Sequence, residues 1–359
     1  MKRVLLFAAA CACAVAGLWA AAHLPADTAP LIEEKYDTWS GVLRVWAAED
    51  TGMPGLTGWL NACAAKVEKA RNGVYISIRT VPGEAIAGFL TTGVNPPDVI
   101  IYPSGLIVPD AGLEVIAAAY PLRRGLSSSP YAVPVLADAH FWIYNTGSYS
   151  TLPADMYQVS AACREEDLNA LTALSTGLRP AEGVSRALPG VDLGLGGAAE
   201  ATPAPAGEVA CRMGPHLTLT DEPRKLFLNG GADAFVGSVS DILYLADKSG
   251  WEAAVTGEYA YTDNLLMCSI VAKDDGRSEI CRAFLDALMS VGQASAARAG
   301  ALPTVAGVSA WAGDMAMARL EAALESRTWV AGAAGASDAA RSYIEGTLSA
   351  DQAMDEIMN

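Results

Sequence analysis

The stretch GVYISIRTVPGEAIAGFLTTGVNPPDVIIYPSG, residues 73–105, decides the fold class of this chain. Residues 74–81 alternate β-branched with polar side chains, which predicts a strand. Residues 84–93 have the composition of a short helix, and 96–105 hold an apolar run bounded by turn residues. The stretch therefore predicts a strand, a helix and a second strand.

A strand at 41–47 and a helix at 57–73 precede this stretch, so the order becomes strand, helix, strand, helix, strand. This order is typical of a doubly wound α/β sheet with right-handed crossovers. Such sheets bind ligands in the crevice at the C-terminal ends of their strands. The residues expected there are Trp46, Glu49, Asp50, Tyr102 and Ser104.

The composition bounds the class of protein. The chain has 359 residues, with 40 acidic and 24 basic side chains and a formal net charge of −16. This length allows two domains with separate cores. No run is rich in Lys and Arg, and a basic patch is what displaces counterions from phosphate, so nucleic acid is not an expected partner.

Residues 1–24 have the pattern of an export signal. A basic MKR precedes the apolar VLLFAAACACAVAGL, and a small-residue site ends at Ala22. The apolar run is also long enough to span a bilayer, so an uncleaved anchor stays open, as does lipidation at Cys11 or Cys13. Residues 25–40 are expected to be a tether. The protein is expected to lie outside the cytoplasm, in a periplasm or at the cell surface.

Residues 179–214 are rich in Gly, Ala, Pro and Glu and lack aromatic side chains, which predicts a mobile surface insertion. If the chain is exported to an oxidising compartment, Cys163 and Cys211 are candidates for a disulfide that closes this segment. The alternative is that the cysteines are buried as free thiols. No two cysteines after the export segment have the C-x-x-C spacing of a metal or redox site.

Catalytic motifs are missing from the sequence. H-E-x-x-H, G-x-S-x-G and P-loop patterns do not occur, so neither an enzyme nor a cofactor or metal site is predicted. His140 is interpreted as an ordinary satisfied histidine beside aromatic residues rather than as a general base. The main enzyme alternative is a surface hydrolase that uses Asp138 and Glu49 as paired carboxylates.

The second half of the chain also alternates strand and helix patterns. Residues 131–147 form two extended runs, and Pro134 inside the first run belongs on an edge or crossing strand. Residues 232–250 predict a short strand, a turn at Gly237 and an apolar helix, and a buried strand follows at 264–273.

Further helical patterns lie in the C-terminal part of the chain. Residues 221–231 begin with Asp221 and a Pro in the first turn. The stretch EICRAFLDALMSVGQASAARAGALPTVAG, residues 279–307, predicts an amphipathic helix, a short second helix and a Gly-Ala-Leu-Pro stop. The last helix is expected to be capped by Ser349.

Five stretches in this order resemble the extracellular solute-binding proteins of ABC-type importers, the group that includes sugar binders. They are PPDVIIYPSG, YAVPVLADAHFWIYN, KLFLNGGADAFVGSVSD, CRAFLDALMSVGQASAARAGALP and IEGTLSADQAMDEI. The resemblance implies a type II periplasmic-binding-protein-like α/β fold of two lobes, each a sheet flanked by helices, with a cleft between them. It places lobe 1 in 41–133 and 266–312 and lobe 2 in 134–265 and 313–359, with chain crossings near Pro134, near Met267 and after Trp311.

The resemblance also implies a function. A monomer would capture a small solute, most simply a carbohydrate, by hinge closure and deliver it to a membrane permease. Sugars are bound by aromatic faces and planar polar groups. The further ligand contacts expected on this basis are Asp138, Trp142, Ser238, Asp241, Tyr261 and Trp311. Replacing Trp142 or Trp311 with Ala is expected to weaken binding without unfolding the protein.

Several alternatives stay open at this point. The sequence GSVSD from Gly237 lacks the Trp that often follows this Gly in sugar binders, which favours a more compact or an anionic ligand. Tyr259 and Tyr261 resemble the paired tyrosines that hold ferric iron in related proteins, and the acidic loops suit a polyamine. A sensor subunit that passes its signal to a membrane kinase is a further alternative.

Overall fold

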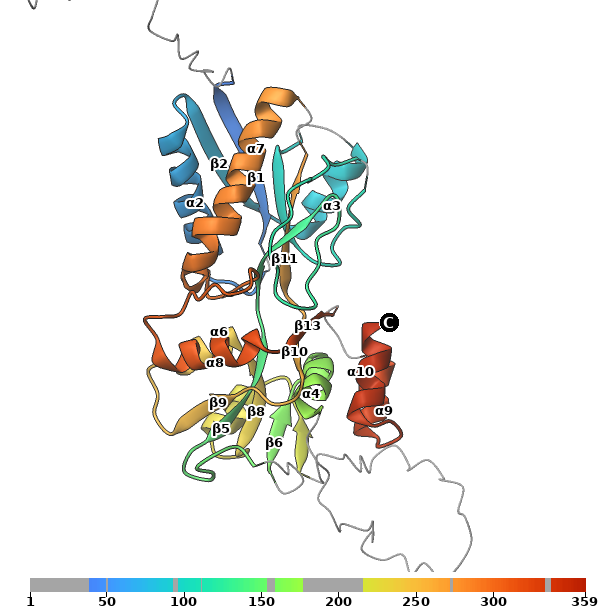
Figure 1. Ribbon diagram of the computed structural model, residues 1–359. Helices are drawn as coiled ribbons and strands as arrows, with labels where there is room; N and C mark the ends of the chain where they lie inside the picture. The colour runs from blue at the N-terminus through green and yellow to red at the C-terminus, as the bar shows by residue number, and fades with distance from the viewer. Residues whose placement is uncertain are drawn as a thin grey trace, which may run out of the picture. The chain divides into compact units, whose positions relative to one another are not determined.

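The strands predicted within 41–47, 74–81 and 96–105 belong to one six-stranded sheet (Figure 1). The structure is a computed structural model, and it describes residues 39–49, 51–92, 96–110, 112–153, 159–176, 216–271, 274–332 and 337–359. In spatial order the strands of this sheet are β12 (Leu302–Pro303), β4 (Val133–Ala137), β11 (Leu265–Ile270), β3 (Val99–Pro103), β1 (Gly41–Ala48) and β2 (Val74–Val81).

Parallel pairing of β1 with both β2 and β3 confirms the predicted strand and helix order. The connecting helices are α2 (Leu56–Ala70) and α3 (Gly83–Thr92). Leu43, Val45 and Ala47 alternate along β1 and are fully buried beneath α2 and α7 (Asp275–Ala287). The other face of the sheet packs against α3, so helices cover both faces.

A five-stranded sheet carries the second half of the fold. Its strands in spatial order are β7 (Leu217–Leu219), β6 (Ala161–Cys163), β8 (Ala234–Ser238), β5 (His140–Asn145) and β9 (Trp251–Ala254). One face packs on α4 (Leu168–Ser175), α9 (Asp338–Ile344) and α10 (Ala350–Met358). The other face packs on α5 (Pro223–Leu228), α6 (Val239–Leu245) and α8 (Met315–Glu325). The three central strands, β6, β8 and β5, are therefore buried on both faces.

The chain passes from the first sheet to the second between Ala137 and His140. It returns through β10 (Tyr259–Thr262), which pairs in parallel with β13 (Thr328–Ala331), and then enters β11. Pro134 lies within β4, beside a shift in the pairing register between Leu266 and Met267 of β11. Because the ladder is irregular at that point, a residue without an N–H is tolerated inside the sheet.

The stretch 279–307 is one irregular helical run rather than two separate helices. After α7 come a π turn η3 (Leu288–Gly292) and a 3-10 segment η4 (Gln293–Ala299), and Gly300 ends the run with φ 73°. Buried Gln293 holds the break, since its Nε2 donates to Val135 O at 2.6 Å and its Oε1 accepts from Thr304 N at 2.7 Å.

Gly237 differs from its predicted turn position because it lies inside β8. A Cβ at this position would come within 2.7 Å of the Phe235 ring and 2.9 Å of Ile143, so the glycine is needed for close packing within the strand. Ser349 does cap the last helix, as expected, and forms a capping box with Gln352.

Some expectations fall outside the described residues. These are the export segment 1–24, all but the last two residues of the tether 25–40, the insertion 179–214 and Cys211 of the suggested disulfide. Within the described part of the chain, none of the helices combines the length and the apolar character that a membrane span requires.

Candidate functional site

The chain passes between the sheets three times, the third time from β12 to α8, and the first two passages lie side by side. We call residues 137–140 and 262–265 the crossing segments. The amide of Asp138 donates to Asn264 O at 3.1 Å, and Leu265 pairs with Ala137. The outgoing and returning segments are therefore joined through their backbones.

The ends of strands β1 and β3 in the first sheet contact the returning crossing segment. The Asn264 side-chain amide donates to Thr51 O, just after β1, and the Ser104 amide, just after β3, donates to Leu265 O at 2.7 Å. Glu49 lies exposed at the end of β1, where its amide donates to Val81 O at 3.0 Å. The C-terminal ends of parallel strands, where α/β sheets bind ligands, thus adjoin the returning crossing segment.

The start of α6 extends this set of contacts into the second sheet. Asp138 Oδ1 accepts from the amide of Val239 at 3.0 Å and from that of Ala139 at 2.7 Å. Ser238 and Asp241 form a capping box at the same helix end. Asp241 is buried, and its Oδ1 also accepts from Arg224 Nη1 at 3.1 Å. Ser238 is therefore the N-cap of α6, and Asp241 completes the capping box from the first turn of the helix.

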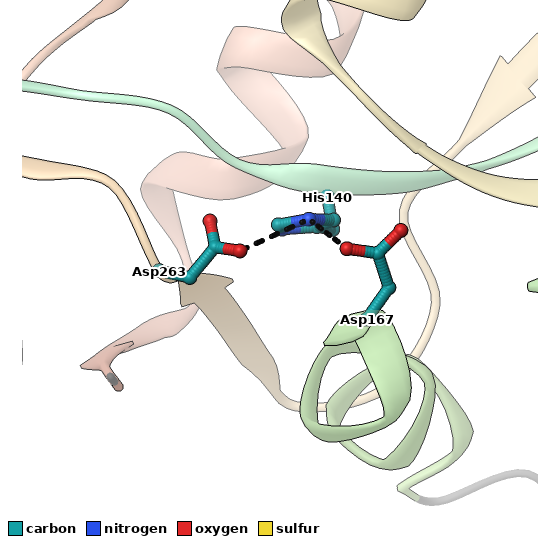
Figure 2. Close-up of side chains that lie close together, drawn as sticks. All are labelled: His140, Asp167 and Asp263. Atoms are coloured by element: carbon teal, nitrogen blue, oxygen red, sulfur yellow. Dashed lines mark ion pairs between the residues drawn. The ribbon is translucent and has the colours of Figure 1, made fainter. Parts of the chain in front are cut away.

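A histidine lies between two carboxylates beside the crossing segments, as Figure 2 shows. Nε2 of His140 is 3.4 Å from Asp167 Oδ1 and 3.9 Å from Asp263 Oδ2. The His140 and Asp167 side chains are each 4% exposed, whereas that of Asp263 is 21% exposed. Three separate elements supply this cluster: β5, the residue before α4, and the returning crossing segment.

Burial and the neighbouring carboxylates shift the pKa of His140 in opposite directions. Burial lowers the pKa of its imidazole, but the hydrogen bond to Asp167 and the charges of Asp263, Asp167 and Asp138 outweigh burial and raise that pKa to about 9. Burial raises the pKa of Asp138 to about 6, although His140 and two backbone amides act in the opposite direction. At neutral pH the histidine is therefore a cation, and Asp138 is largely ionised.

Asp167 also pairs with an arginine. Its Oδ2 accepts from Arg164 Nη1 at 3.1 Å, while its Oδ1 faces His140. Burial raises the pKa of Asp167, but His140 and Arg164 outweigh burial, so the net shift is downward. Asp167 is therefore an ionised acceptor for two cations.

Tyr261 lies next to this cluster on β10. Its hydroxyl accepts from Asn169 Nδ2 at 3.2 Å, and its ring centroid is 5.9 Å from that of His140. Burial raises the pKa of its phenol to about 12, so the side chain is neutral at physiological pH.

Three aromatic side chains predicted as ligand contacts lie inside cores. Trp142 is fully buried between β5 and the helices beneath it, Tyr102 shares a hydrogen bond of 2.8 Å with Ser269, and the indole N–H of Trp311 donates to Ala301 O at 3.0 Å. Trp46 is half-buried and packs edge-on against Phe89. Asp50 lies outside the described residues.

Apart from Trp46 and Asp50, the predicted site residues separate into two groups. Glu49, Ser104, Asp138, Ser238 and Asp241 lie around the crossing segments, with Tyr261 behind them, while Tyr102, Trp142 and Trp311 lie within the cores. Sequence reasoning missed Asp167 and Asp263. The available signal was Asp138-Ala-His140 in an otherwise apolar run, since charged groups buried together need partners.

Binding proteins are among the solved structures with a similar fold. The cyclic α-maltosyl-1,6-maltose binding protein of Arthrobacter globiformis aligns over 89% of this chain and 97% of its own, with a TM-score of 0.59 and 14% identity. The GacH receptor of Streptomyces glaucescens, solved unliganded and with acarbose, covers the same shares with a TM-score of 0.56 and 16% identity.

A third similar structure is the galacto-N-biose/lacto-N-biose I binding protein of an ABC transporter from Bifidobacterium longum. It covers 89% of this chain and 94% of its own, with a TM-score of 0.55 and 12% identity. No protein-family model and no curated protein sequence matches this chain. The predicted two-lobe α/β fold is confirmed by these likenesses, which at such identities concern the fold alone.

Proposed function

We propose that this chain is an exported binding protein that captures a small solute, most simply a carbohydrate, and delivers it to an ABC-type importer in the membrane. The observation that carries this proposal is the hydrogen-bonded set around the crossing segments. These hydrogen bonds link strand ends of one sheet to the start of a helix on the other sheet. The residues that form them are Thr51, Ser104, Asn264, Asp138 and Val239.

This arrangement suits a hinge. Few backbone positions connect the two sheets at the crossing segments, and small changes there would move the sheets relative to each other. A solute that contacts both lobes favours the closed form by the difference between its affinities for the closed and open forms. We accordingly propose lobe 1 as 41–133 with 266–312 and lobe 2 as 134–265 with 313–359, with the outgoing crossing placed a few residues later, after Ala137.

The exposed polar groups favour a ligand with many hydroxyl groups. Glu49 offers carboxylate oxygens, and Ser104 offers a hydroxyl. Half-buried Trp46 is the aromatic candidate, because Trp142 and Trp311 are occupied with core packing. Sugar ligands in the structurally similar binding proteins support the same class, and export with a permease partner follows from this role.

A screen of the purified chain tests the proposal. Mono- and oligosaccharides, polyamines and amino acids are compared by thermal shift, because a ligand that binds only the native state raises the melting temperature. A hit is then titrated by calorimetry, where micromolar affinity corresponds to about −8 kcal/mol. Prolonged incubation followed by product analysis separates binding from hydrolysis.

Two glutamate variants sharpen the assignment. Glu49→Gln is expected to weaken sugar binding about tenfold, since a hydrogen bond to a charged group is worth about 1.5–3 kcal/mol. Glu356→Gln, at an exposed position on α10, serves as the matched control and is expected to bind normally. If no sugar stabilises the protein, or if the sugar is cleaved, the proposed function is wrong.

A further inference from the structure

The cluster of His140, Asp167 and Asp263 combines one imidazole nitrogen with two carboxylate oxygens. Their donor atoms all lie within 4.8 Å of one another, and the three residues come from three different elements (Figure 2). Hydrogen bonds and ion pairs already orient Asp167, whose Oδ2 is held by Arg164 and whose Oδ1 faces the histidine. The geometry is that of a preformed three-ligand set.

Negative charge exceeds positive charge in this part of the molecule. The carboxylates of Asp138, Asp167 and Asp263 lie around His140, and the nearby Arg164 is shared between Asp167, Asp241 and Glu166. Buried carboxylates are stable only when paired with cations or hydrogen-bond donors. The surroundings of His140 thus favour more positive charge than the side chains supply.

We propose that His140 Nε2, Asp167 Oδ1 and Asp263 Oδ2 bind a divalent transition-metal ion of the zinc class. Such an ion lies about 2.0–2.2 Å from nitrogen and oxygen ligands, which puts tetrahedral donors about 3.4 Å apart. The His140 to Asp167 separation of 3.4 Å matches this value, the 3.9 Å from His140 to Asp263 is longer, and all three donor atoms lie within 4.8 Å of one another, so the carboxylates move inward when the ion binds. Asp263 is the partly exposed ligand, so its side chain is free to move toward the ion, and the ion enters from its side.

The ion replaces a proton. At neutral pH the Nε2 proton of His140 leaves to the solvent, and its lone pair binds the metal, while both carboxylates stay ionised. The three ligands carry a net charge of −1 with the imidazolium and reach zero with the bound divalent ion. Water fills the remaining coordination position on the exposed side of Asp263.

The imidazole ligand sets the metal class. Calcium and magnesium prefer sites built from oxygen ligands alone, and they gain little from a nitrogen donor. Zinc, cobalt and manganese accept mixed nitrogen and carboxylate sites. The site therefore distinguishes zinc from the two abundant hard cations.

The location of the site gives the ion a mechanical role. His140 begins β5 at the end of the outgoing crossing segment, and Asp263 lies in the returning one. A metal bound to both residues and to Asp167 ties the two crossing segments to the lobe 2 sheet. The proposal is independent of the proposed solute-binding function, because its test uses the metal ion without any solute.

Calorimetry on the full chain tests the site after chelator treatment and dialysis. Zinc chloride is titrated into the wild type, His140→Gln, Asp263→Asn and the control Asp247→Asn, which changes an exposed carboxylate outside the cluster. We expect one zinc-binding event in the wild type and in the control. That event should weaken at least about tenfold in His140→Gln and in Asp263→Asn, as expected for loss of a metal ligand.

Cobalt provides a spectroscopic check, since its visible spectrum distinguishes nitrogen and oxygen ligands from thiolates contributed by cysteines. Magnesium and calcium at the same concentration should give no binding heat that depends on His140. Asp263→Asn guards against misfolding of the histidine variant, because Asp263 is the least buried ligand. The proposal is overturned if zinc does not bind, or if it binds His140→Gln and Asp263→Asn as tightly as the control.

Discussion

The charge on His140 predicts a loss of stability at alkaline pH. Its imidazole titrates near pH 6.5 in an unfolded chain, and the surrounding carboxylates raise the pKa to about 9 in the folded protein. Because the folded pKa is the higher one, the stabilisation is fully present below pH 6.5 and is lost as the pH rises through about 9. A difference of this size corresponds to about 3 kcal/mol of unfolding free energy.

The groups around His140 titrate mainly outside the range from pH 6.5 to 9. The pKa of Asp138 is raised mainly by burial, to about 6, so its contribution is lost as the pH rises through about 6, below most of the window. The pKa of Asp167 is lowered, so its contribution is lost only as the pH falls toward the acid range. Arg164 stays charged throughout, and burial raises the pKa of the Tyr261 phenol to about 12.

Urea unfolding at several pH values between 6.5 and 9, with a chelator present, measures this effect. The wild type is expected to lose about 3 kcal/mol across the window, whereas His140→Gln should begin lower and stay nearly constant. His216 is exposed, so His216→Gln serves as the matched control and should follow the wild-type slope. An equal slope in His140→Gln would refute the reasoning.

Three further substitutions test the cores and the helix start. Trp142→Ala is expected to destabilise the protein by about 3–5 kcal/mol in urea unfolding, because the indole is fully buried; unchanged stability with weaker solute binding would instead restore the ligand role expected from the sequence. Asp241→Ala should cost about 1–3 kcal/mol in the same assay, since it removes the acceptor for the Ser238 amide in the capping box and a partner of Arg224, and an unchanged midpoint would contradict this. Gln293→Ala leaves the Thr304 amide unpaired and should cost about 1–3 kcal/mol, with faster amide exchange at Thr304 as the local readout.

Local patterns predicted much of the fold. The strand, helix, strand order from β1 to β3 and the Ser349 cap follow from side-chain periodicity and from hydrogen bonds within one turn of helix. Gly237 was placed in a turn because glycine alone does not distinguish a turn from a crowded strand. Only the packing of Phe235 and Ile143 on that residue decides between the two.

The candidate site depended on contacts that no local pattern encodes. Glu49 and Ser104 could be placed at strand ends from the sequence, because the C-terminal edge of a parallel sheet follows from the strand order. Trp142 could not be assigned to the core in advance, since its burial requires helices α4 and α10 from distant parts of the chain.

The sequence by itself determined that this protein is an α/β chain of alternating strands and helices, because hydrophobic periodicity is a property of neighbouring residues. Tertiary structure alone decided that His140, Asp167 and Asp263 meet beside the crossing segments. These residues are far apart along the chain, and their charges act on one another only after folding has buried them together, where water no longer screens them.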